Sequence, residues 1–151
     1  MYSMWLTTEE QEIWRGYLAM VSALDIAMNR QLQSDCGISR SDYDVLVTLD
    51  EQGPQRMFAL GAALGWEQSR LSHQVRRMRE RGLVSRADTK ADRRGATVSL
   101  TAAGRAALRK AAPGHAALVR GLVFDGMTHA QREGFRSVVD TVLARTRDQS
   151  G

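Results

Sequence analysis

The residues best suited to do chemistry form a basic run in the middle of the chain. Residues 68–94 hold nine Arg or Lys against three acids, a net charge of +6, while the whole chain carries only +4. The basicity is therefore local. Such local basicity is expected of a surface that binds a polyanion, rather than of one that only keeps a protein in solution.

A helix is predicted over 68–81, with Gly82 ending it. At 100° per residue its apolar residues share one side and should face the core: Leu71, Val75 and Met78. The opposite side and its flanks collect hydroxyl, basic and amide side chains: Ser69, Arg70, Ser72, His73, Gln74, Arg76 and Arg77. Arg can bond guanine O6 and N7 together, and Ser reaches base edges or phosphate, so this face suits a DNA major groove. The alternative is a basic face that is only solvated.

Two short strand-like runs, 83–86 and 96–100, follow this helix and enclose a polar tip. The tip carries Asp92, Arg93 and Arg94. Asp92 can pair with Arg94 and hold its guanidinium outward, and an extended Arg fits a narrow A·T-rich minor groove. The alternative is a charged loop kept soluble by its own ion pairs.

A long first helix is predicted near the N-terminus. Two overlapping capping boxes, Thr7 with Glu10 and Thr8 with Gln11, could begin it, and it should run to about Ser34. Its apolar residues form two stripes: Ile13, Tyr17, Met20, Leu24, Met28 and Leu32, and Trp14, Leu18 and Val21. Together these stripes are wider than one amphipathic face. A helix that is apolar on two sides contacts more than one partner, and the second partner could be another subunit.

Two shorter helices are predicted over 40–51 and 57–64. Gly37 should stop the first helix and Ser39 should cap the second. The inner face of the second helix is predicted to hold Tyr43, Leu46, Val47 and Leu49. No strand is predicted before the basic helix. Helix, helix, turn and basic helix is the layout of a helix-turn-helix.

Helices should also close the chain. Thr101 should cap a helix that Pro113 interrupts before it resumes to Phe124. A last helix is predicted from Thr128 to about Arg145, with an apolar stripe along it. The predicted fold class is therefore mainly α with a small β-hairpin.

Signals for other kinds of site are few. The three scattered histidines and the single cysteine, Cys36, lack metal-ligand spacing. No nucleophile–base pair, catalytic carboxylate pair or phosphate loop is recognisable, so we expect no catalytic residues, no metal, no cofactor and no enzyme activity. Four residues could line a ligand pocket, although aromatic residues at helical spacing are more often core: Trp14, Tyr17, Tyr43 and Met57. The first residues lack a signal-peptide pattern, and no apolar run reaches the ~18 residues of a membrane span, so we expect a cytoplasmic protein without membrane partners.

Several of these stretches occur together in one known family. They are Leu64-Gly65, residues 71–78, Arg81-Gly82-Leu83-Val84, Asp92-Arg93-Arg94 and residues 98–104. The wing pattern of that family is Asp, any, Arg, three residues, an aliphatic, any, Leu-Thr. It falls without a gap on Asp92, Arg94, Val98, Leu100 and Thr101. Residues 39–104 thus resemble the MarR (multiple antibiotic resistance regulator) family of bacterial transcription factors.

The resemblance implies a winged helix-turn-helix DNA-binding lobe over 37–101. It implies a helical dimerisation lobe built from both chain ends, namely the first helix within 1–36 and the helices of 102–147. Such proteins are homodimers that bind pseudo-palindromic operators in double-stranded DNA, usually as repressors. A small aromatic or phenolic ligand, bound in a crevice between the lobes, releases them from the DNA. This chain departs from the family where Trp66-Glu67, in place of the common Ser or Thr, begins the basic helix.

Three alternatives stay open on the sequence. A winged helix that has lost DNA reading could serve as a protein-interaction module. A small-molecule carrier or enzyme could use the helical crevice. A redox-responsive repressor could use Cys36, although family sensors generally place their cysteine earlier, on the first long helix. A helix-end residue of weak packing value is the simpler interpretation of Cys36.

Overall fold

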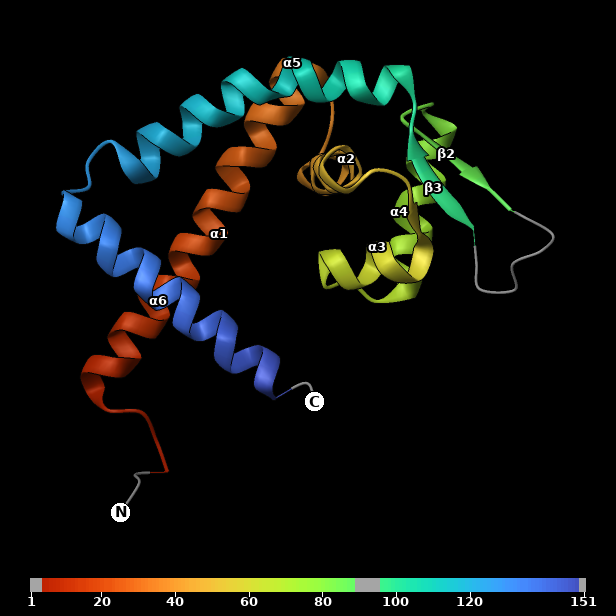
Figure 1. Cartoon of the computed structure of the whole chain (residues 1–151). Helices are drawn as coiled ribbons and strands as arrows, with labels where there is room; N and C mark the ends of the chain where they lie inside the picture. Colours follow the sequence, from red (N-terminus) through yellow and green to blue (C-terminus); the bar gives the residue numbers. More distant parts are fainter. Residues whose placement is uncertain (1–3, 89–95, 150–151) are drawn as a thin grey trace. The chain divides into compact units, whose positions relative to one another are not determined.

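The structure is a computed structural model that describes residues 4–88 and 96–149. Its elements run in the order α1 (Thr8–Cys36), α2 (Arg40–Gln52), β1 (Gln55–Arg56), α3 (Met57–Leu64), α4 (Gln68–Glu80), β2 (Val84–Ala87), β3 (Thr97–Leu100), α5 (Ala102–Val119), the π-helical turn η1 (Arg120–Phe124) and α6 (His129–Asp148) (Figure 1). Two units divide the chain, Met1–His115 and Ala116–Gly151, and the boundary falls inside α5. The predicted class, mainly α with a small hairpin, is confirmed.

Side-chain caps fix where α1, α2 and α6 begin, whereas α3 and α4 begin without a side-chain cap. Thr7 caps α1 in a capping box with Glu10, so the first of the two predicted boxes is the one used. Ser39 caps α2 and Thr128 caps α6, and each again forms a capping box. A capping box satisfies two backbone N–H groups that a helix start leaves without partners. The predicted helix starts are therefore confirmed by the bonds that were expected to set them.

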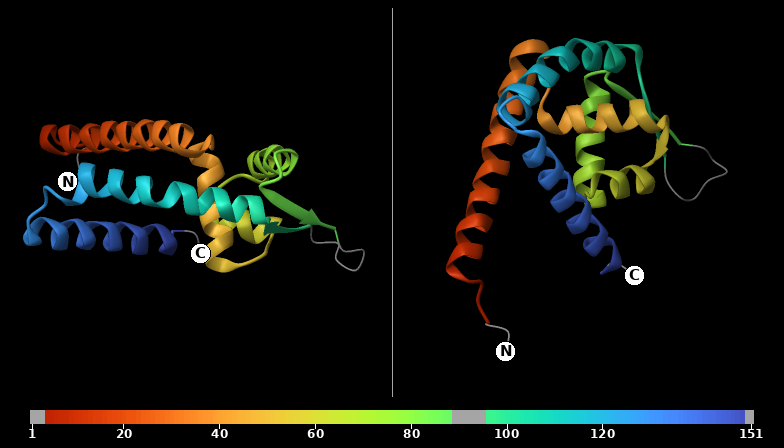
Figure 2. Two further views of the ribbon diagram at one scale, coloured as in Figure 1. Left: turned by 90° about the horizontal axis from the view of Figure 1, so that it is seen from above. Right: turned by 60° about the vertical axis from the view of Figure 1, so that its left-hand side comes forward.

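The three strands form one antiparallel sheet in the order β1-β3-β2. Val84 lies opposite Leu100 and Ala87 lies opposite Thr97 in the β2–β3 pair. The expectation that no strand precedes the basic helix is wrong, because β1 pairs with β3. Figure 2 shows the β2–β3 hairpin extending away from the helices of the first unit. A helix-turn-helix followed by such a sheet is a winged helix-turn-helix.

The core of the first unit lies where α1, α2, α3, α4 and the sheet meet. Its fully buried side chains include Leu32, Ile38, Val45, Leu46, Leu60, Leu71, Val75, Met78 and Val98. The inner side predicted for α4 is confirmed, since all three of its apolar residues are buried. On α2, Leu46 and Leu49 are buried as predicted, Tyr43 and Val47 are only partly buried, and Val45 is an additional core residue.

Helix α5 continues through Pro113 without a break. The predicted interruption at this proline is therefore wrong. Regular α-helix ends later, at Val119, where the chain widens into the π-helical turn Arg120–Phe124. Of the described helices, none combines the length and apolar character needed to cross a membrane.

Helices α1 and α6 each expose a broad apolar face within the single chain. On α1 the exposed residues are Ile13, Trp14, Tyr17, Leu18, Met20 and Val21. On α6 they are Phe135, Val138, Val139, Val142 and Leu143. Contiguous apolar patches of this kind are uncommon on the surface of a monomer.

Candidate nucleic-acid interface

A tight connection between α3 and α4 fixes the direction of the basic helix. Gly65 ends α3 in the left-handed conformation, with φ of 67°, and the Trp66 N–H donates to Gly61 O over 3.0 Å. The Gln68 amide reaches back to Met57 O over 3.2 Å. A methyl group on Gly61 would meet the end of the Gln68 side chain, so this amide would have to move away from Met57 O.

Most of the predicted contact residues lie on one exposed side of α4. They are Ser69, Arg70, Ser72, His73, Arg76 and Arg77. Gln74 is an exception. It was expected on a flank of this face, but its side chain is buried, and its Nε2 donates to Asp42 Oδ1 over 2.6 Å. The structure therefore brings six of the seven predicted helix residues to the surface and turns the seventh into the lobe.

Two contacts hold basic side chains of α4, one at Arg70 and one at Arg76. The Arg70 guanidinium carbon lies 4.0 Å from the centre of the Trp66 ring. Arg76 Nη2 lies 3.0 Å from His73 Nδ1. Because a guanidinium can only donate, His73 Nδ1 must accept, and the ring proton then resides on Nε2. The other ring nitrogen of this exposed residue, Nε2, is therefore an N–H donor.

A buried carboxylate ties α4 to the rest of the lobe. Asp42 is almost fully buried, and its Oδ2 accepts from Arg81 Nη1 over 2.8 Å and from the Ser39 N–H over 2.9 Å. Arg81 also donates to Gly37 O over 2.7 Å. This network was not predicted from the sequence, although the Ser-x-x-Asp spacing of Ser39 and Asp42 is that of the capping box of α2.

The wing is described only at its base. Thr101 Oγ1 donates to Gly82 O over 2.6 Å and accepts from the Gly104 N–H over 3.0 Å, so Thr101 links the wing to α5. On β2, Arg86 Nε lies 3.7 Å from Asp88 Oδ1. The predicted tip residues lie outside the described residues: Asp92, Arg93 and Arg94.

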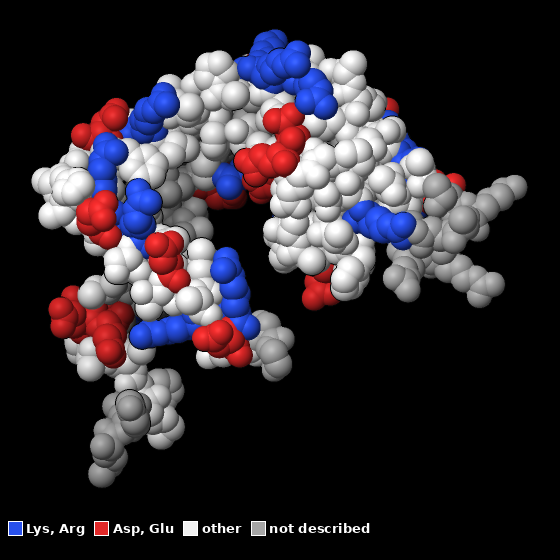
Figure 3. Space-filling view, in the orientation of Figure 1, with Lys and Arg blue, Asp and Glu red and all other residues white. Residues whose placement is uncertain are grey.

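Figure 3 shows Lys and Arg side chains on the surface of the first unit. A second basic group lies over α5, where Arg105, Arg109 and Lys110 are exposed. Arg105 Nη1 in this group donates to Asp50 Oδ1 over 2.9 Å. The α5 group thus includes a cation that already has a partner.

The four residues proposed to line a ligand pocket do not lie together. Trp14 and Tyr17 stack with ring centres 5.4 Å apart on the exposed face of α1. On α1, Asn29 contacts the start of α2. Tyr17 lies 12 residues before Asn29, which is roughly 18 Å along the helix. Met57 is a core residue.

Tyr43 has a different neighbourhood from the other three. Its ring centre lies 4.6 Å from that of His115 on α5. Among the described side chains, Gln31 Oε1 and His115 Nδ1 are buried polar atoms without a hydrogen-bond partner. Burial lowers the pKa of His115 and the nearby Arg40 adds to this, so the ring is neutral at pH 7. No local pattern in the sequence predicted that Gln31 and His115 would have buried, unpaired polar atoms.

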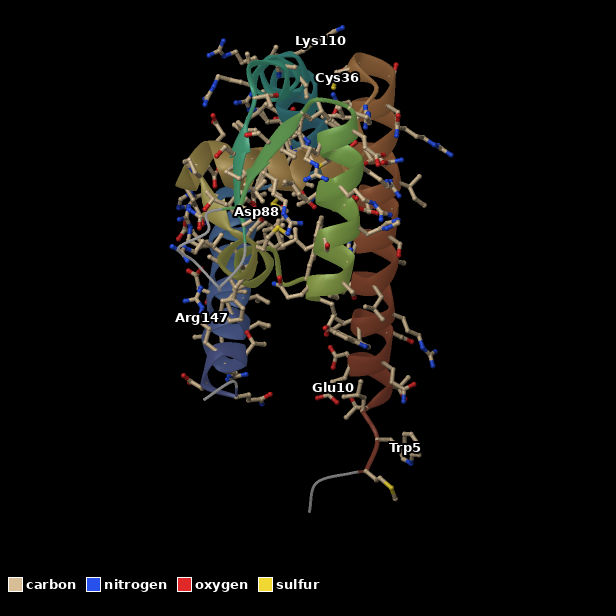
Figure 4. All side chains as sticks on the ribbon, turned by 90° about the vertical axis from the view of Figure 1, so that its right-hand side faces the viewer. Trp5, Glu10, Cys36, Asp88, Lys110 and Arg147 are labelled. Carbon is tan, nitrogen blue, oxygen red and sulfur yellow. The ribbon has the colours of Figure 1, made fainter. Side chains whose placement is uncertain are left out.

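Cys36 lies at the end of α1 with Lys110 of α5 nearby (Figure 4). Its Sγ contacts Leu32 O at 3.3 Å, and burial raises the pKa of the thiol above its ordinary value. Within the described ranges, no group of three or more His, Cys, Asp or Glu side chains is placed to hold a metal ion.

Comparison with known proteins gives a consistent result. The family model described as MarR family matches residues 38–95. The structure is similar to Sco3205, a MarR family transcriptional regulator from Streptomyces coelicolor in complex with DNA. That match has 38% identity and a TM-score of 0.86, and covers 93% of this chain and 90% of that chain.

Two further solved structures are similar over nearly the whole chain. AbsC, a MarR family transcriptional regulator from Streptomyces coelicolor, matches with 34% identity and a TM-score of 0.87, over 97% of this chain and 99% of that chain. CouR from Rhodococcus jostii RHA1, bound to p-coumaroyl-CoA, has the same fold, with 24% identity and a TM-score of 0.73, over 93% of this chain and 95% of that chain. A search among curated proteins found no match.

Proposed function

The chain belongs to the MarR family, and from this premise we propose that it is a homodimeric, sequence-specific regulator of transcription, acting as a repressor on a pseudo-palindromic operator in double-stranded DNA. The observation that carries the proposal is the exposed side of α4. It offers two serine hydroxyls, one histidine N–H and three guanidinium groups on a helix whose other side is buried. These are the donors that read base edges in a major groove.

The proposed contacts fall into two groups. Arg70 and His73 lie in the first half of α4, where a recognition helix usually meets bases. Arg76 and Arg77 lie in its second half, where we assign them to phosphates. Arg93 and Arg94 would reach the DNA from the wing. Gln74 is left out of the contact set because its amide is already bonded inside the lobe.

A second copy of the chain would explain the apolar faces. Trp14 and Val138 are both more than half exposed in the single chain, each within an apolar stripe. A two-fold dimer would bury such stripes and present two α4 helices to two half-sites. Sedimentation at micromolar concentration should therefore show a dimer, and a monomer would contradict this part of the proposal.

A small aromatic ligand could act at Tyr43 and His115. Gln31 Oε1 is a buried acceptor on α1, and the Gln31 side chain lies close to Gly114, which directly precedes His115. His115 Nδ1 is also unpaired, and a phenolic hydroxyl could donate to either atom. CouR, bound to p-coumaroyl-CoA, has the same fold. The ligand must prefer the conformation that releases DNA, since equal affinity for both conformations shifts nothing.

The test of DNA reading uses a labelled duplex from upstream of the gene and a scrambled duplex of equal composition, at about 150 mM salt, because affinities for DNA depend strongly on salt. Wild type should prefer the upstream duplex. Arg70→Ala should cost roughly 1–3 kcal/mol per half-site and relax preference at one position of each half-site.

The matched control is Arg105→Ala. It removes the same charge from an exposed position outside the α4 face, where the guanidinium is paired with Asp50. Its operator affinity should stay close to that of wild type. Equal losses in the two variants would mean that only total charge matters, and that α4 does not read sequence.

The ligand is tested in the same assay with a panel of phenols and aromatic carboxylates. These compounds should weaken DNA binding by wild type more than DNA binding by Gln31→Met.

A further inference from the structure

The Arg70 side chain does not extend freely from α4. Its guanidinium carbon lies 4.0 Å from the centre of the Trp66 ring, at the turn between α3 and α4. This distance is well within the range in which a guanidinium is attracted to the face of an aromatic ring. Arg70 itself is exposed, so the two residues meet on the surface that the proposed function assigns to DNA.

Trp66 is held more firmly than Arg70. Its ring is partly buried against the core of the lobe. Its backbone N–H donates to Gly61 O over 3.0 Å, which anchors the residue to α3. A side chain fixed by the core at one end and exposed at the other is suited to support a mobile neighbour.

Stacking occupies the flat face of a guanidinium but leaves its N–H edge available. Arg has five N–H donors in a planar fork, and two of them suffice for guanine O6 and N7. An unrestrained Arg loses rotamer freedom when it binds, whereas an arginine already stacked has less to lose. The Trp66 contact therefore favours binding of Arg70 to a base edge, which requires one orientation of the guanidinium. It favours binding to phosphates less, because phosphates accept many orientations.

We propose that Trp66 is a specificity-determining residue, which acts as a platform that orients the Arg70 guanidinium toward one base pair of each half-site. This inference rests on the proposed function, because it assumes that α4 reads DNA. It adds a positioning residue outside the exposed face of α4.

The experiment compares Trp66→Leu, Trp66→Phe, Arg70→Ala and the double variant Trp66→Leu/Arg70→Ala. A duplex that wild type selects from a random library is the probe, together with its single base-pair substitutions. Leu keeps apolar packing against the core but has no aromatic face, while Phe keeps an aromatic face. Thermal unfolding of each variant reports whether the lobe remains folded.

Trp66→Leu should weaken binding to the selected duplex roughly 5- to 30-fold for a dimer with two half-sites, and Trp66→Phe should weaken it less. Trp66→Leu should also flatten base preference at the same position as Arg70→Ala. In the Arg70→Ala background, replacing Trp66 should change affinity less than about twofold, because the group it orients is already gone.

Two results would overturn the inference while leaving the proposed function intact. One is an equal loss from Trp66→Leu with and without Arg70, which would mean that Trp66 acts only on packing or touches DNA itself. Another is an even loss across all duplexes with base preference intact. If Trp66→Leu does not fold, Trp66→Phe is compared with a second double variant, Trp66→Phe/Arg70→Ala, and a measurable loss from Trp66→Phe that is equal with and without Arg70 has the same meaning. A wild-type protein that selects no duplex would instead overturn the proposed function, and the inference with it.

Discussion

The Gln74 side-chain amide donates to Oδ1 of Asp42 over 2.6 Å, and both side chains are buried. The other oxygen of the carboxylate holds Arg81 and the Ser39 N–H. One carboxylate therefore joins Gln74 on α4, and Arg81 directly after the end of α4, to the start of α2. The orientation of the exposed α4 face follows from this polar contact as well as from the apolar core beneath it.

Replacing Asp42 should destabilise the lobe. Asp42→Ala would leave the Gln74 amide buried without an acceptor, release Arg81 and remove half of the capping box of α2. We expect the free energy of unfolding to fall by about 2–4 kcal/mol, measured by urea denaturation at fixed protein concentration. The control is Asp50→Ala, which removes an exposed carboxylate paired with Arg105 and should cost about 1 kcal/mol or less. Similar losses in both variants would mean that the Asp42 network adds little.

Local signals predicted the helices well. Each cap needs only residues within one turn, as at Thr7, Ser39 and Thr128, and each was found where the sequence indicates. The inner side of α4 also followed from periodicity alone. Gln74 was placed wrongly because a helical wheel predicts only the direction of a side chain around the helix. It cannot identify the hydrogen-bond partner, Asp42, which lies 32 residues away in the sequence.

Features that depend on contacts with distant parts of the chain could not be predicted from local sequence patterns. Gln55 and Arg56 form a strand only because β3 lies beside them, and two residues carry no alternation to detect. Pro113 was expected to break α5 because proline lacks the N–H that bonds back along a helix. In the folded chain, Ala111 is fully buried just before Pro113, and Gly114 just after it lies close to Gln31 of α1. The helix is therefore packed against other residues on both sides of Pro113, and it continues through the proline.

Stability should depend on pH through His115. Burial and Arg40 lower the pKa of His115 in the folded chain, against a smaller opposing effect of Asp44. The unfolded chain therefore binds the proton more readily, and stability present above about pH 6.5 should be lost as the pH falls through the folded pKa. His115→Phe keeps a ring against Tyr43 but cannot be protonated. Between pH 7 and pH 5 its free energy of unfolding should fall less steeply than that of wild type, and parallel falls would exclude His115 as the cause.

Cys36 should be unreactive near neutral pH. Burial, with a smaller effect from Asp35, raises the pKa of its thiol, so little reactive thiolate is present at pH 7.5. Alkylation by iodoacetamide should be slow there and should accelerate only as the pH rises above the ordinary pKa of a free thiol. Hydrogen peroxide should leave operator binding unchanged in wild type and in Cys36→Ser alike. Release of DNA by peroxide in wild type alone would instead support the redox-responsive alternative.

Replacing Asp92 in the wing should change operator affinity in a direction that separates two roles of its carboxylate, namely orienting Arg94 and repelling DNA. If Asp92 holds the Arg94 guanidinium outward, Asp92→Ala should weaken operator binding, even though it removes a negative charge near DNA. Arg94→Ala should weaken it as well and should lower the salt dependence by about one phosphate equivalent per subunit if Arg94 neutralises backbone charge. Asp88→Ala is the matched control, because Asp88 is an exposed wing carboxylate whose neighbour is Arg86 on the strand. Charge removal alone would make both aspartate variants bind as well as wild type or better. Tighter binding by Asp88→Ala together with weaker binding by Asp92→Ala would show that the Asp92 carboxylate acts by orienting Arg94, and tighter binding by both would refute that role.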